Sequence, residues 1–238
     1  MSDADVKRRN FLKTSLGAAA VAIAPGMLLY KVAHSESEDA SSKVRWGMLI
    51  DTTQCKPGCN DCVTACNKEN GLPGGTTPTD SQWMRKIEIK DVSTGRELSL
   101  PMMCQHCESP PCVDVCPTAA SFKRADGIVL VDKHLCIGCR YCMMACPYKA
   151  RSFVHEPLHN QNPDVPRGKG TVESCTLCVH RIDKGLQPAC AESCTNKAIL
   201  FGDLHDANSD IAKKVLSVAS VQIRGDLQLN PGIHYQGL

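Results

Sequence analysis

Four cysteines spaced two, two and three residues apart, with a proline after the last, lie in HLCIGCRYCMMACP, residues 134–147. The two short gaps hold Cys136, Cys139 and Cys142 on one tight loop. Three thiolates on one loop can bind three corners of a small inorganic cube, whereas Cys146 lies a helical turn further on and points away from it. The spacing therefore predicts a ligand set that needs a fourth cysteine from elsewhere in the chain.

The chain has sixteen cysteines, and all of them fall into four such groups. Each group ends in a Cys-x3-Cys pair, and a proline follows the last cysteine of the second and third groups. The groups are, in order, Cys55, Cys59, Cys62 and Cys66; Cys104, Cys107, Cys112 and Cys116; Cys136, Cys139, Cys142 and Cys146; and Cys175, Cys178, Cys190 and Cys194. Four complete quartets with no cysteine left over indicate four metal sites.

Three kinds of site could use these cysteines. Disulfides are disfavoured because Cys-x2-Cys neighbours are too close to pair with good geometry outside redox motifs. Zinc sites usually combine two Cys-x2-Cys pairs across a longer loop, rather than four cysteines within a dozen residues. Iron–sulfur clusters suit the quartets best, so we predict four [4Fe-4S] clusters. A zinc-stapled structural subunit is the alternative from another functional class.

The third group resembles bacterial ferredoxins, in which three cysteines of such a run bind one cluster and the fourth binds its neighbour. On this resemblance the second and third groups form one two-cluster module, and the first and fourth groups form another. The predicted ligand sets are site 1, Cys55, Cys59, Cys62 and Cys194; site 2, Cys104, Cys107, Cys112 and Cys146; site 3, Cys136, Cys139, Cys142 and Cys116; and site 4, Cys175, Cys178, Cys190 and Cys66.

We therefore expect a loop-rich α+β fold of two bacterial-ferredoxin-like modules, one inserted in the other. The outer module would comprise residues 44–103 plus 165–204, the inner module residues 104–164, and a C-terminal tail residues 205–238. Aromatic residues make up only 4% of the chain, so bound metal has to brace the small cores.

Three strands and one helix are predicted around these groups. Residues 44–51, 128–131 and 197–204 have strand-like sequences, and an Asp-Gly turn precedes the second. Residues 210–220 of the tail are modestly amphipathic and could form either a docking arm or a packed surface helix.

Histidines and basic residues near the cysteines could act on the clusters. Because every quartet is already complete, His106 and His180 are expected to donate hydrogen bonds near cluster sulfurs or to lie in solvated loops. Arg140 and Lys149 could raise cluster potentials through their positive charge, or could simply be solvated. The formal net charge of +2 does not suggest a nucleic-acid binder, and no set of residues for bond chemistry stands out.

The N-terminus has the pattern of an export signal. KRRNFLK, residues 7–13, precedes an apolar stretch that is short for a bilayer span. It resembles the twin-arginine signal at Arg8, Arg9, Phe11, Leu12 and Lys13. Residues 1–35 are therefore predicted to direct a folded, cofactor-loaded protein to the periplasm. No transmembrane helix is predicted after residue 35, so membrane association would come through partners or an uncleaved signal.

Residues 45–204 resemble the four-cluster ferredoxin subunits of membrane-bound respiratory complexes, such as polysulfide, dimethyl sulfoxide and nitrate reductases. The resemblance is carried by CESPPCVDVCPTAA, CIGCRYCMMACPYKAR and CTLCVHRIDKGLQPACAESC. It implies an electron-transfer subunit rather than an enzyme. Some members replace the second cysteine of the third group and hold a [3Fe-4S] cluster, whereas Cys139 implies [4Fe-4S]. Two departures are the longer first gap of the first group and Thr195, where many relatives have proline.

Within this family, WGMLIDTTQCKPGCNDC and CIGCRYCMMACPYKARSFVHE look most like the periplasmic iron–sulfur subunits of DsrMKJOP-type complexes in sulfur-metabolising bacteria. That resemblance implies an integral membrane quinone-reactive subunit as partner, with a periplasmic multihaem cytochrome c nearby, and site 3 as the cluster nearest the quinone. The alternative is the electron-transfer subunit of a molybdopterin oxidoreductase of the polysulfide, thiosulfate or dimethyl sulfoxide reductase type.

Overall fold

The computed structural model describes residues 40–238, apart from 75–76, 78 and 160. The predicted signal, residues 1–35, therefore lies outside the described residues. No helix within the described range is long and apolar enough to cross a membrane.

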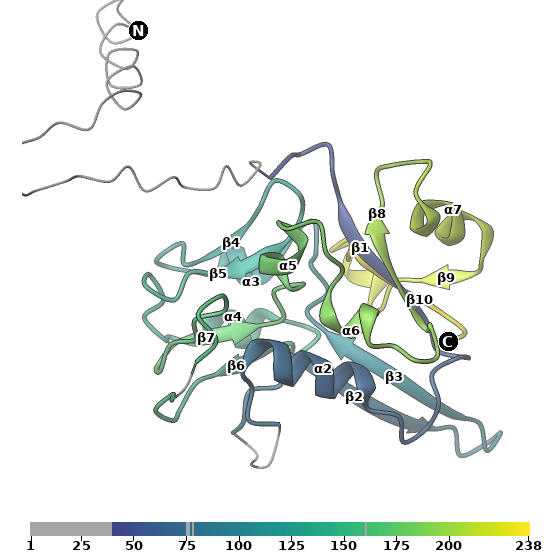
Figure 1. Ribbon diagram of the computed structural model, residues 1–238, viewed down its shortest axis with the longest axis horizontal. Helices are drawn as coiled ribbons and strands as arrows, with labels where there is room; N and C mark the ends of the chain where they lie inside the picture. The colour runs from purple at the N-terminus through teal and green to yellow at the C-terminus, as the bar shows by residue number, and fades with distance from the viewer. Residues whose placement is uncertain (1–39, 75–76, 78, 160) are drawn as a thin grey trace, which may run out of the picture. The chain divides into compact units, whose positions relative to one another are not determined.

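A mixed four-stranded sheet in the order β8-β1-β10-β9 is the largest regular element (Figure 1). Strand β1 (Trp46–Asp51) pairs antiparallel with β8 (Ile199–Asp203) and parallel with β10 (Ile233–Gln236). Strand β9 (Ser220–Val221) pairs with the far side of β10. The predicted strands at 44–51 and 197–204 are confirmed as β1 and β8, with slightly shorter bounds. Five of the six residues of β1 are buried, as expected of a strand with neighbours on both sides.

Residues 205–238, which the sequence pattern sets apart as a tail, pack onto and into this sheet. Helix α7 (Asp210–Ser217) begins after Ser209, whose Oγ accepts a hydrogen bond from the Ala212 amide at 3.1 Å. Ile211 of this helix is buried against β8, and β10 lies beside β1. The packed-helix interpretation of residues 210–220 is therefore confirmed.

The remaining strands of the described residues form three two-stranded antiparallel sheets. The second of these sheets contains the predicted strand at 128–131, which is thereby confirmed. The pairs are β2 (Met84–Lys90) with β3 (Glu97–Met103), β4 (Ser121–Lys123) with β5 (Val129–Val131), and β6 (Arg151–Phe153) with β7 (Val172–Ser174).

Short helices hold the cysteine groups. The helices are α2 (Asp61–Asn70), α3 (Pro111–Asp114), α4 (Tyr141–Ala145), α5 (Val179–Ile182) and α6 (Ala189–Glu192), followed near the C-terminus by the 3-10 turn η1 (Gly225–Leu227). A proline is the first residue of α3, and another immediately precedes α6, where its missing N–H costs no helical hydrogen bond. With small sheets, short helices and long connections, the fold is the loop-rich α+β type that the sequence predicts.

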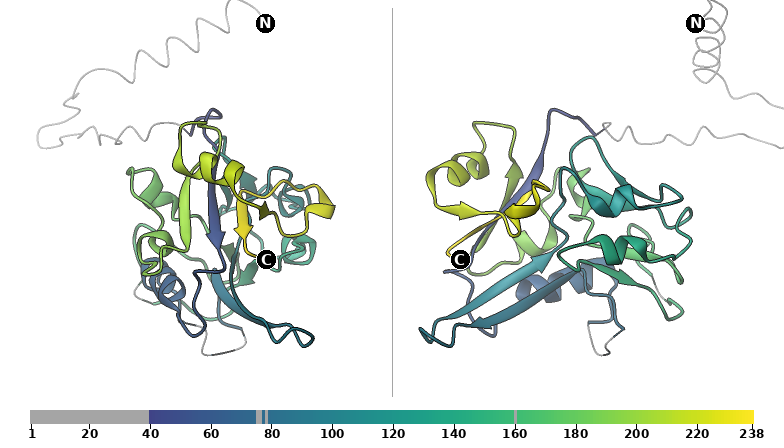
Figure 2. Two further views of the ribbon diagram at one scale, coloured as in Figure 1. Left: turned by 90° about the vertical axis from the view of Figure 1, so that its right-hand side faces the viewer. Right: turned by 180° about the vertical axis from the view of Figure 1, so that it is seen from behind.

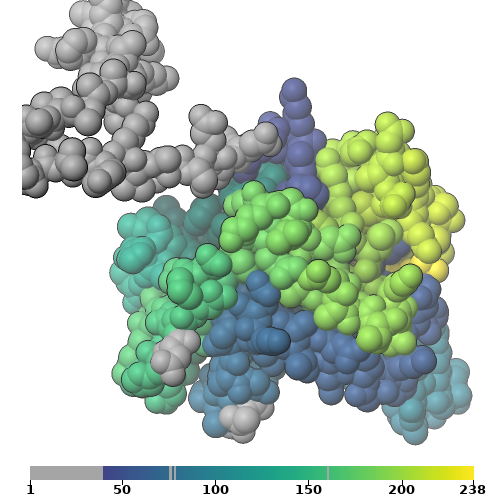
Figure 3. Space-filling view, in the orientation of Figure 1, coloured from purple at the N-terminus to yellow at the C-terminus, as the bar shows by residue number. Residues whose placement is uncertain are grey.

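The described unit has two ends of different construction. The four-stranded sheet and α7 lie at one end, and the two short sheets β4–β5 and β6–β7 lie at the other with α3 and α4 (Figures 1 and 2). The space-filling view shows the same division, with the teal and green segments on one side and the yellow C-terminal segment on the other (Figure 3). Helix α2 packs against both α6 and strand β2.

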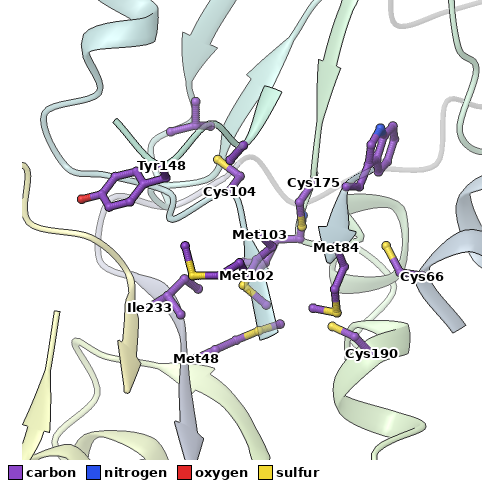
Figure 4. Packing of buried hydrophobic residues seen from close by; sticks show 14 of the residues in the cluster. Met48, Cys66, Met84, Met102, Met103, Cys104, Tyr148, Cys175, Cys190 and Ile233 are labelled. Carbon is purple, nitrogen blue, oxygen red and sulfur yellow. The ribbon is translucent and has the colours of Figure 1, made fainter. Parts of the chain in front are cut away.

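Sulfur-bearing side chains take the place of aromatic rings in the core. Met48, Met84, Met102 and Met103 belong to one buried cluster that includes most of the cysteines (Figure 4). Methionine is flexible and polarisable, so it fills the irregular space beside short loops. The cluster also contains Tyr235 of β10, which has no exposed surface.

Tyr235 ties the C-terminal strand to the β2–β3 hairpin. Its Oη donates a hydrogen bond to the Pro101 carbonyl at 3.0 Å and accepts one from Gln105 Nε2 at 3.2 Å. Both partners are buried. The hydroxyl thus satisfies two polar groups that water cannot reach.

Replacing Tyr235 by phenylalanine should therefore destabilise the protein without creating a cavity. The loss of two buried hydrogen bonds costs on the order of 1–2 kcal/mol, which lowers the midpoint of thermal unfolding by roughly 3–6 °C in a domain of this size. Differential scanning calorimetry under anaerobic conditions measures the shift. Tyr141→Phe is the matched control, because Tyr141 is 60% exposed and should unfold as the wild type does. Equal midpoints for Tyr235→Phe and the wild type would contradict the assignment.

Candidate metal centres

The four cysteines of site 3 surround one cavity. Cys116 follows α3, while Cys136, Cys139 and Cys142 lie on the loop that leads into α4 and at its start. The cavity measures about 310 Å³, including space open to solvent. Cys139 is the only one of the sixteen cysteines that is exposed. The site 3 loop therefore lies at the protein surface.

Gly138 allows the site 3 loop to pack closely on the chain beyond β6. Its φ of +71° is in the left-handed region, and a Cβ placed there would lie 2.2 Å from the Gly170 carbonyl oxygen. A backbone oxygen cannot move aside as the end of a flexible side chain can. Only glycine fits between the thiols Cys136 and Cys139 in this conformation.

The four cysteines of site 2 surround a second cavity of about 320 Å³. Cys104 directly follows β3, Cys112 lies in α3, and Cys146 directly follows α4. All four of these cysteines, including Cys107, are buried. Burial raises the pKa of Cys104 and of Cys107 to about 12, with the neighbouring thiols adding to the rise.

The four cysteines of site 4 surround a third cavity of about 310 Å³. Cys66 comes from α2, Cys175 directly follows β7, and Cys190 lies in α6. Cys178 completes the set at the start of α5. Here too all four thiols are buried. Burial raises the pKa of Cys175 and of Cys190 well above the usual thiol range.

The four cysteines of site 1 lie close together around Cys62 of helix α2. Burial raises the pKa of Cys62 to about 11, and Cys55, Cys194 and Cys59 lie close enough to add to it. The longer first gap of this group is held by Lys86, whose Nζ donates to the carbonyls of Lys56 and Cys59 at 2.5 and 2.6 Å. Cys55 therefore stays with its set despite the extra residue.

Each predicted set of four cysteines is thus brought together in space. The third and fourth cysteines of each group lie on or beside one of the helices α2, α3, α4 and α6, so that each of these four helices joins two neighbouring sites. Helix α2 packs on α6 and joins sites 1 and 4, while α3 packs on α4 and joins sites 2 and 3. The role of these cysteines as iron ligands remains a prediction at this point.

The arrangement of the thiols suits a group larger than a single ion. All sixteen cysteines are free thiols. In sites 2, 3 and 4 they surround a space rather than converge on a point, and no three His, Cys, Asp or Glu residues of the described chain are placed to hold one metal ion.

Buried donors without partners gather at the same cavities. Nine buried side-chain atoms of the described residues lack a hydrogen-bond partner, and all but those of His106 and Gln236 belong to residues that line the three cavities. Those able to donate are Trp83 Nε1, Thr176 Oγ1, Ser121 Oγ, and Arg151 Nε and Nη1. Such orphans are rare in folded proteins. The inorganic sulfides of an iron–sulfur cube would accept these hydrogen bonds, so the residues present fit the group.

Backbone amides already donate to several thiols. The Ser121 amide reaches Cys116 Sγ at 3.3 Å, and the Ala198 amide reaches Cys194 Sγ at 3.2 Å. The Ala150 amide reaches the corresponding cysteine of the third group at 3.5 Å. The fourth cysteine is therefore held in the same way in three groups. Such bonds stabilise the thiolate form and raise the potential of a bound cluster.

The sites follow one another in a single order. Cys190 of site 4 lies close enough to Cys62 of site 1 for the charge on that thiol to contribute to its raised pKa. Cys104 of site 2 acts in the same way on Cys175 of site 4, and Figure 4 shows these two side chains in the core. Sites 2 and 3 share one lining residue, Arg151. The order in space is therefore site 1, site 4, site 2, site 3.

The histidines behave differently from one another. His106 is fully buried, its Nδ1 accepts the Val129 amide at 3.0 Å, and burial lowers its pKa to about 3. The solvated-loop interpretation is therefore wrong for His106. His180 pairs instead with Glu69 at 2.8 Å. Neither histidine lines one of the three cavities.

Of the two basic residues named from sequence, only Arg140 lines a cavity. It lies at site 3, where its guanidinium stacks on the Phe153 ring at 3.8 Å. Lys149 is exposed and lines none of the three. Sequence reasoning missed Arg151, Trp83 and Asn70, of which Asn70 Nδ2 donates to Cys66 Sγ at 3.6 Å. Asn70 and Arg151 lie four and five residues beyond a cysteine group, which was the only available signal, whereas Trp83 is too far from any group to give one.

Comparison with known proteins identifies relatives that are iron–sulfur subunits, which agrees with the class of protein that the cysteine sites suggest. Residues 96–204 match the 4Fe-4S dicluster domain family. The chain is 41% identical to the Hdr-like menaquinol oxidoreductase iron–sulfur subunit 1 of Archaeoglobus fulgidus, over 98% of both chains. It is 39% identical to a tetrathionate reductase subunit of Salmonella typhimurium, over 87% of this chain and 78% of that protein. It is 34% identical to a sulfite dehydrogenase subunit of Allochromatium vinosum, over 79% and 81%.

The chain therefore belongs to the family of ferredoxin-like iron–sulfur subunits of respiratory complexes. It is an electron-transfer subunit of an oxidoreductase complex and not its catalytic subunit. The dicluster match and the sixteen cysteines support [4Fe-4S] clusters as its cofactors.

Gly138→Ala should damage site 3 and leave the other sites loaded. The new Cβ meets the Gly170 carbonyl in a backbone conformation that alanine already disfavours, so the loop holding three of the four thiols has to move. If each of the four sites holds one cube, iron per chain should fall by about a quarter. Iron analysis and EPR spectroscopy of the reduced protein measure this. The control is Gly185→Ala, whose φ of +73° is similar but whose Cβ would meet nothing within 4 Å. Equal iron losses in both variants would show that the close packing is unimportant.

Proposed function

We propose that this chain is an exported subunit with four [4Fe-4S] clusters, which relays single electrons between a quinone-reactive integral membrane subunit and a redox partner in sulfur metabolism. The observation that supports it best is the row of four cysteine sets, with unpaired buried donors at three of them. When bound, each cluster supplies a one-electron acceptor and donor. The chain itself positions the thiols, excludes water from sites 2 and 4, and offers N–H groups to the sulfurs.

The proposal includes the nested modules and their ligand sets. Sites 2 and 3 draw every cysteine from residues 104–146, and sites 1 and 4 draw theirs only from the flanking residues. This division supports an inner module, residues 104–164, inserted into an outer module, residues 44–103 plus 165–204. The short sheet β6–β7 joins the two across the proposed boundary.

The surface around site 3 supports its role as the quinone-side end of the row. Cys139 is exposed, and the apolar side chains Ile137, Tyr141 and Met144 beside it are 67%, 60% and 76% exposed. Because electron transfer needs a short distance, an end site at the surface is a suitable port. The likeness over nearly the whole chain to a subunit named for menaquinol oxidation supports a quinol as the reductant or product.

A second candidate is the electron-transfer subunit of a molybdopterin oxidoreductase. The similarity to the tetrathionate reductase subunit favours it. The two candidates differ in the partner at the site 1 end, which would be a periplasmic multihaem cytochrome c in the first case and a molybdenum catalytic subunit in the second. The membrane partner is expected in both.

Metal analysis of the intact complex tests the proposed cofactors. Anaerobic purification from membranes should yield about 16 iron and about 16 acid-labile sulfide per chain, from four cubes with four cysteines each. Mass spectrometry of the co-purified subunits then identifies the partner, with covalently bound haem expected for the first candidate and molybdenum for the second. Stoichiometric zinc, or iron for only two cubes, would overturn the four-cluster proposal.

Export by the twin-arginine route has its own test. Arg8→Lys combined with Arg9→Lys should leave cluster-loaded protein in the cytoplasm, because the paired arginines define this signal. Immunoblots of periplasmic and cytoplasmic fractions measure the distribution. Lys31→Arg is the control, since it exchanges a basic residue outside the KRRNFLK segment. Normal periplasmic accumulation of the double variant would exclude this route.

A further inference from the structure

Arg151, the first residue of β6, lies between the cavities of sites 2 and 3. It is the only charged residue that lines both cavities. Its Nη2 donates to Cys112 Sγ of site 2 at 3.1 Å, and the whole residue is only 5% exposed. The Nε and Nη1 groups have no partner among the described residues. Two donors of a buried cation are thus left over at the boundary between two cysteine sets.

Thiols of both sites lie close enough to Arg151 to interact with its charge, namely Cys112, Cys104 and Cys142. The first two thiols belong to site 2 and the third belongs to site 3. Within the described chain Arg151 forms no ion pair with a carboxylate, whereas buried Arg167 is paired with Glu173 through two hydrogen bonds of 3.0 and 2.7 Å.

A buried charge of this kind is costly unless an opposite charge lies close to it. The arginine side chain stays protonated in proteins and presents its donors in a rigid planar fork. A planar fork placed between two clusters holds donors toward both in a fixed geometry, whereas an ammonium group is a compact point charge without that geometry. The position therefore suits a cation shared between two anionic clusters rather than a tie to one cysteine.

We propose that Arg151 is a positioning residue shared by the two inner clusters, and that it raises the reduction potentials of both together. The inference rests on the proposed function. Adding an electron to either cluster adds negative charge, and a fixed positive charge in a site of low dielectric lowers the energy of that step. Because the same guanidinium faces sites 2 and 3, its removal should affect both. Sites 1 and 4 should keep their potentials, since Arg151 does not line the site 4 cavity and site 1 lies beyond it.

The test is a redox titration of the cluster-loaded full chain, followed by EPR spectroscopy. Arg151→Gln removes the charge at similar length, and both inner clusters should then become harder to reduce while the two outer clusters are unchanged. Arg151→Lys keeps the charge but not the fork, so it should restore part of the shift. The matched control is Arg140→Gln, because Arg140 lines only the site 3 cavity and is exposed. It should leave site 2 unmoved and shift site 3 less than Arg151→Gln does.

A merely structural role predicts different results. Potentials that do not move, that move at one inner cluster only, or that move equally at all four clusters overturn the proposal. Iron analysis of the wild type distinguishes a failure of the proposed function from a failure of the role proposed for Arg151. Little or no iron there refutes the proposed function, whereas full loading with unmoved potentials refutes only the role of Arg151.

A measurement that keeps Arg151 decides the matter where an Arg151 variant loses its clusters. Labelling the arginines of the Arg140→Gln variant with nitrogen-15 and recording pulsed EPR spectra of the reduced protein detects guanidinium nitrogen next to each cluster, without a contribution from Arg140. Coupling to both inner clusters is the expected result. Coupling to neither, or to one alone, would overturn a shared position.

Discussion

Four thiols that face one another across a buried space cannot all ionise unless positive charge lies between them. Burial and mutual repulsion raise the pKa of Cys104 and Cys107 to about 12 and that of Cys62 to about 11. Iron supplies the missing charge, so loading of the sites releases protons and contributes to the free energy of folding. The loop-rich chain, with few aromatic side chains and short helices, depends on that contribution for much of its order.

The strands near the two ends of the described chain pack around the cysteine sites. Strand β1 leads into the first cysteine group, and β10, almost the last segment of the chain, pairs with it in parallel. Tyr235 of β10 is hydrogen-bonded to the segment that leads into Cys104. The first and last strands of the described unit are thus fixed to site 1 and to the segment that leads into site 2, while sites 2 and 3 are held by two-stranded sheets of three residues a strand. Those sheets need little apolar burial of their own if the clusters brace them.

The cysteine pattern predicted a large part of this structure. The four groups, the strands β1, β5 and β8, and the loop-rich α+β class follow from spacing, alternation and turn residues that are local in the sequence. Strand β10 was not predicted because IHYQ is short and its partner lies about 185 residues away. In the sequence PYKARSF, nothing distinguishes Arg151 from a surface cation such as the nearby exposed Lys149. Its burial depends on the pairing of β6 with β7, which sets the face of the strand from which its side chain projects.

The proposed insertion also explains why the order of the sites in space differs from their order in the sequence. The chain enters the inner module at Cys104, directly after β3, and on the return to the outer module Cys175 directly follows β7. Both strands therefore bring the chain to the junction, and a site 2 thiol and a site 4 thiol meet there. Sites 1 and 3 are left as the two ends of the row. Nesting one two-cluster unit in another is thus sufficient to build a continuous electron path with two separate ends, without any further element to align it.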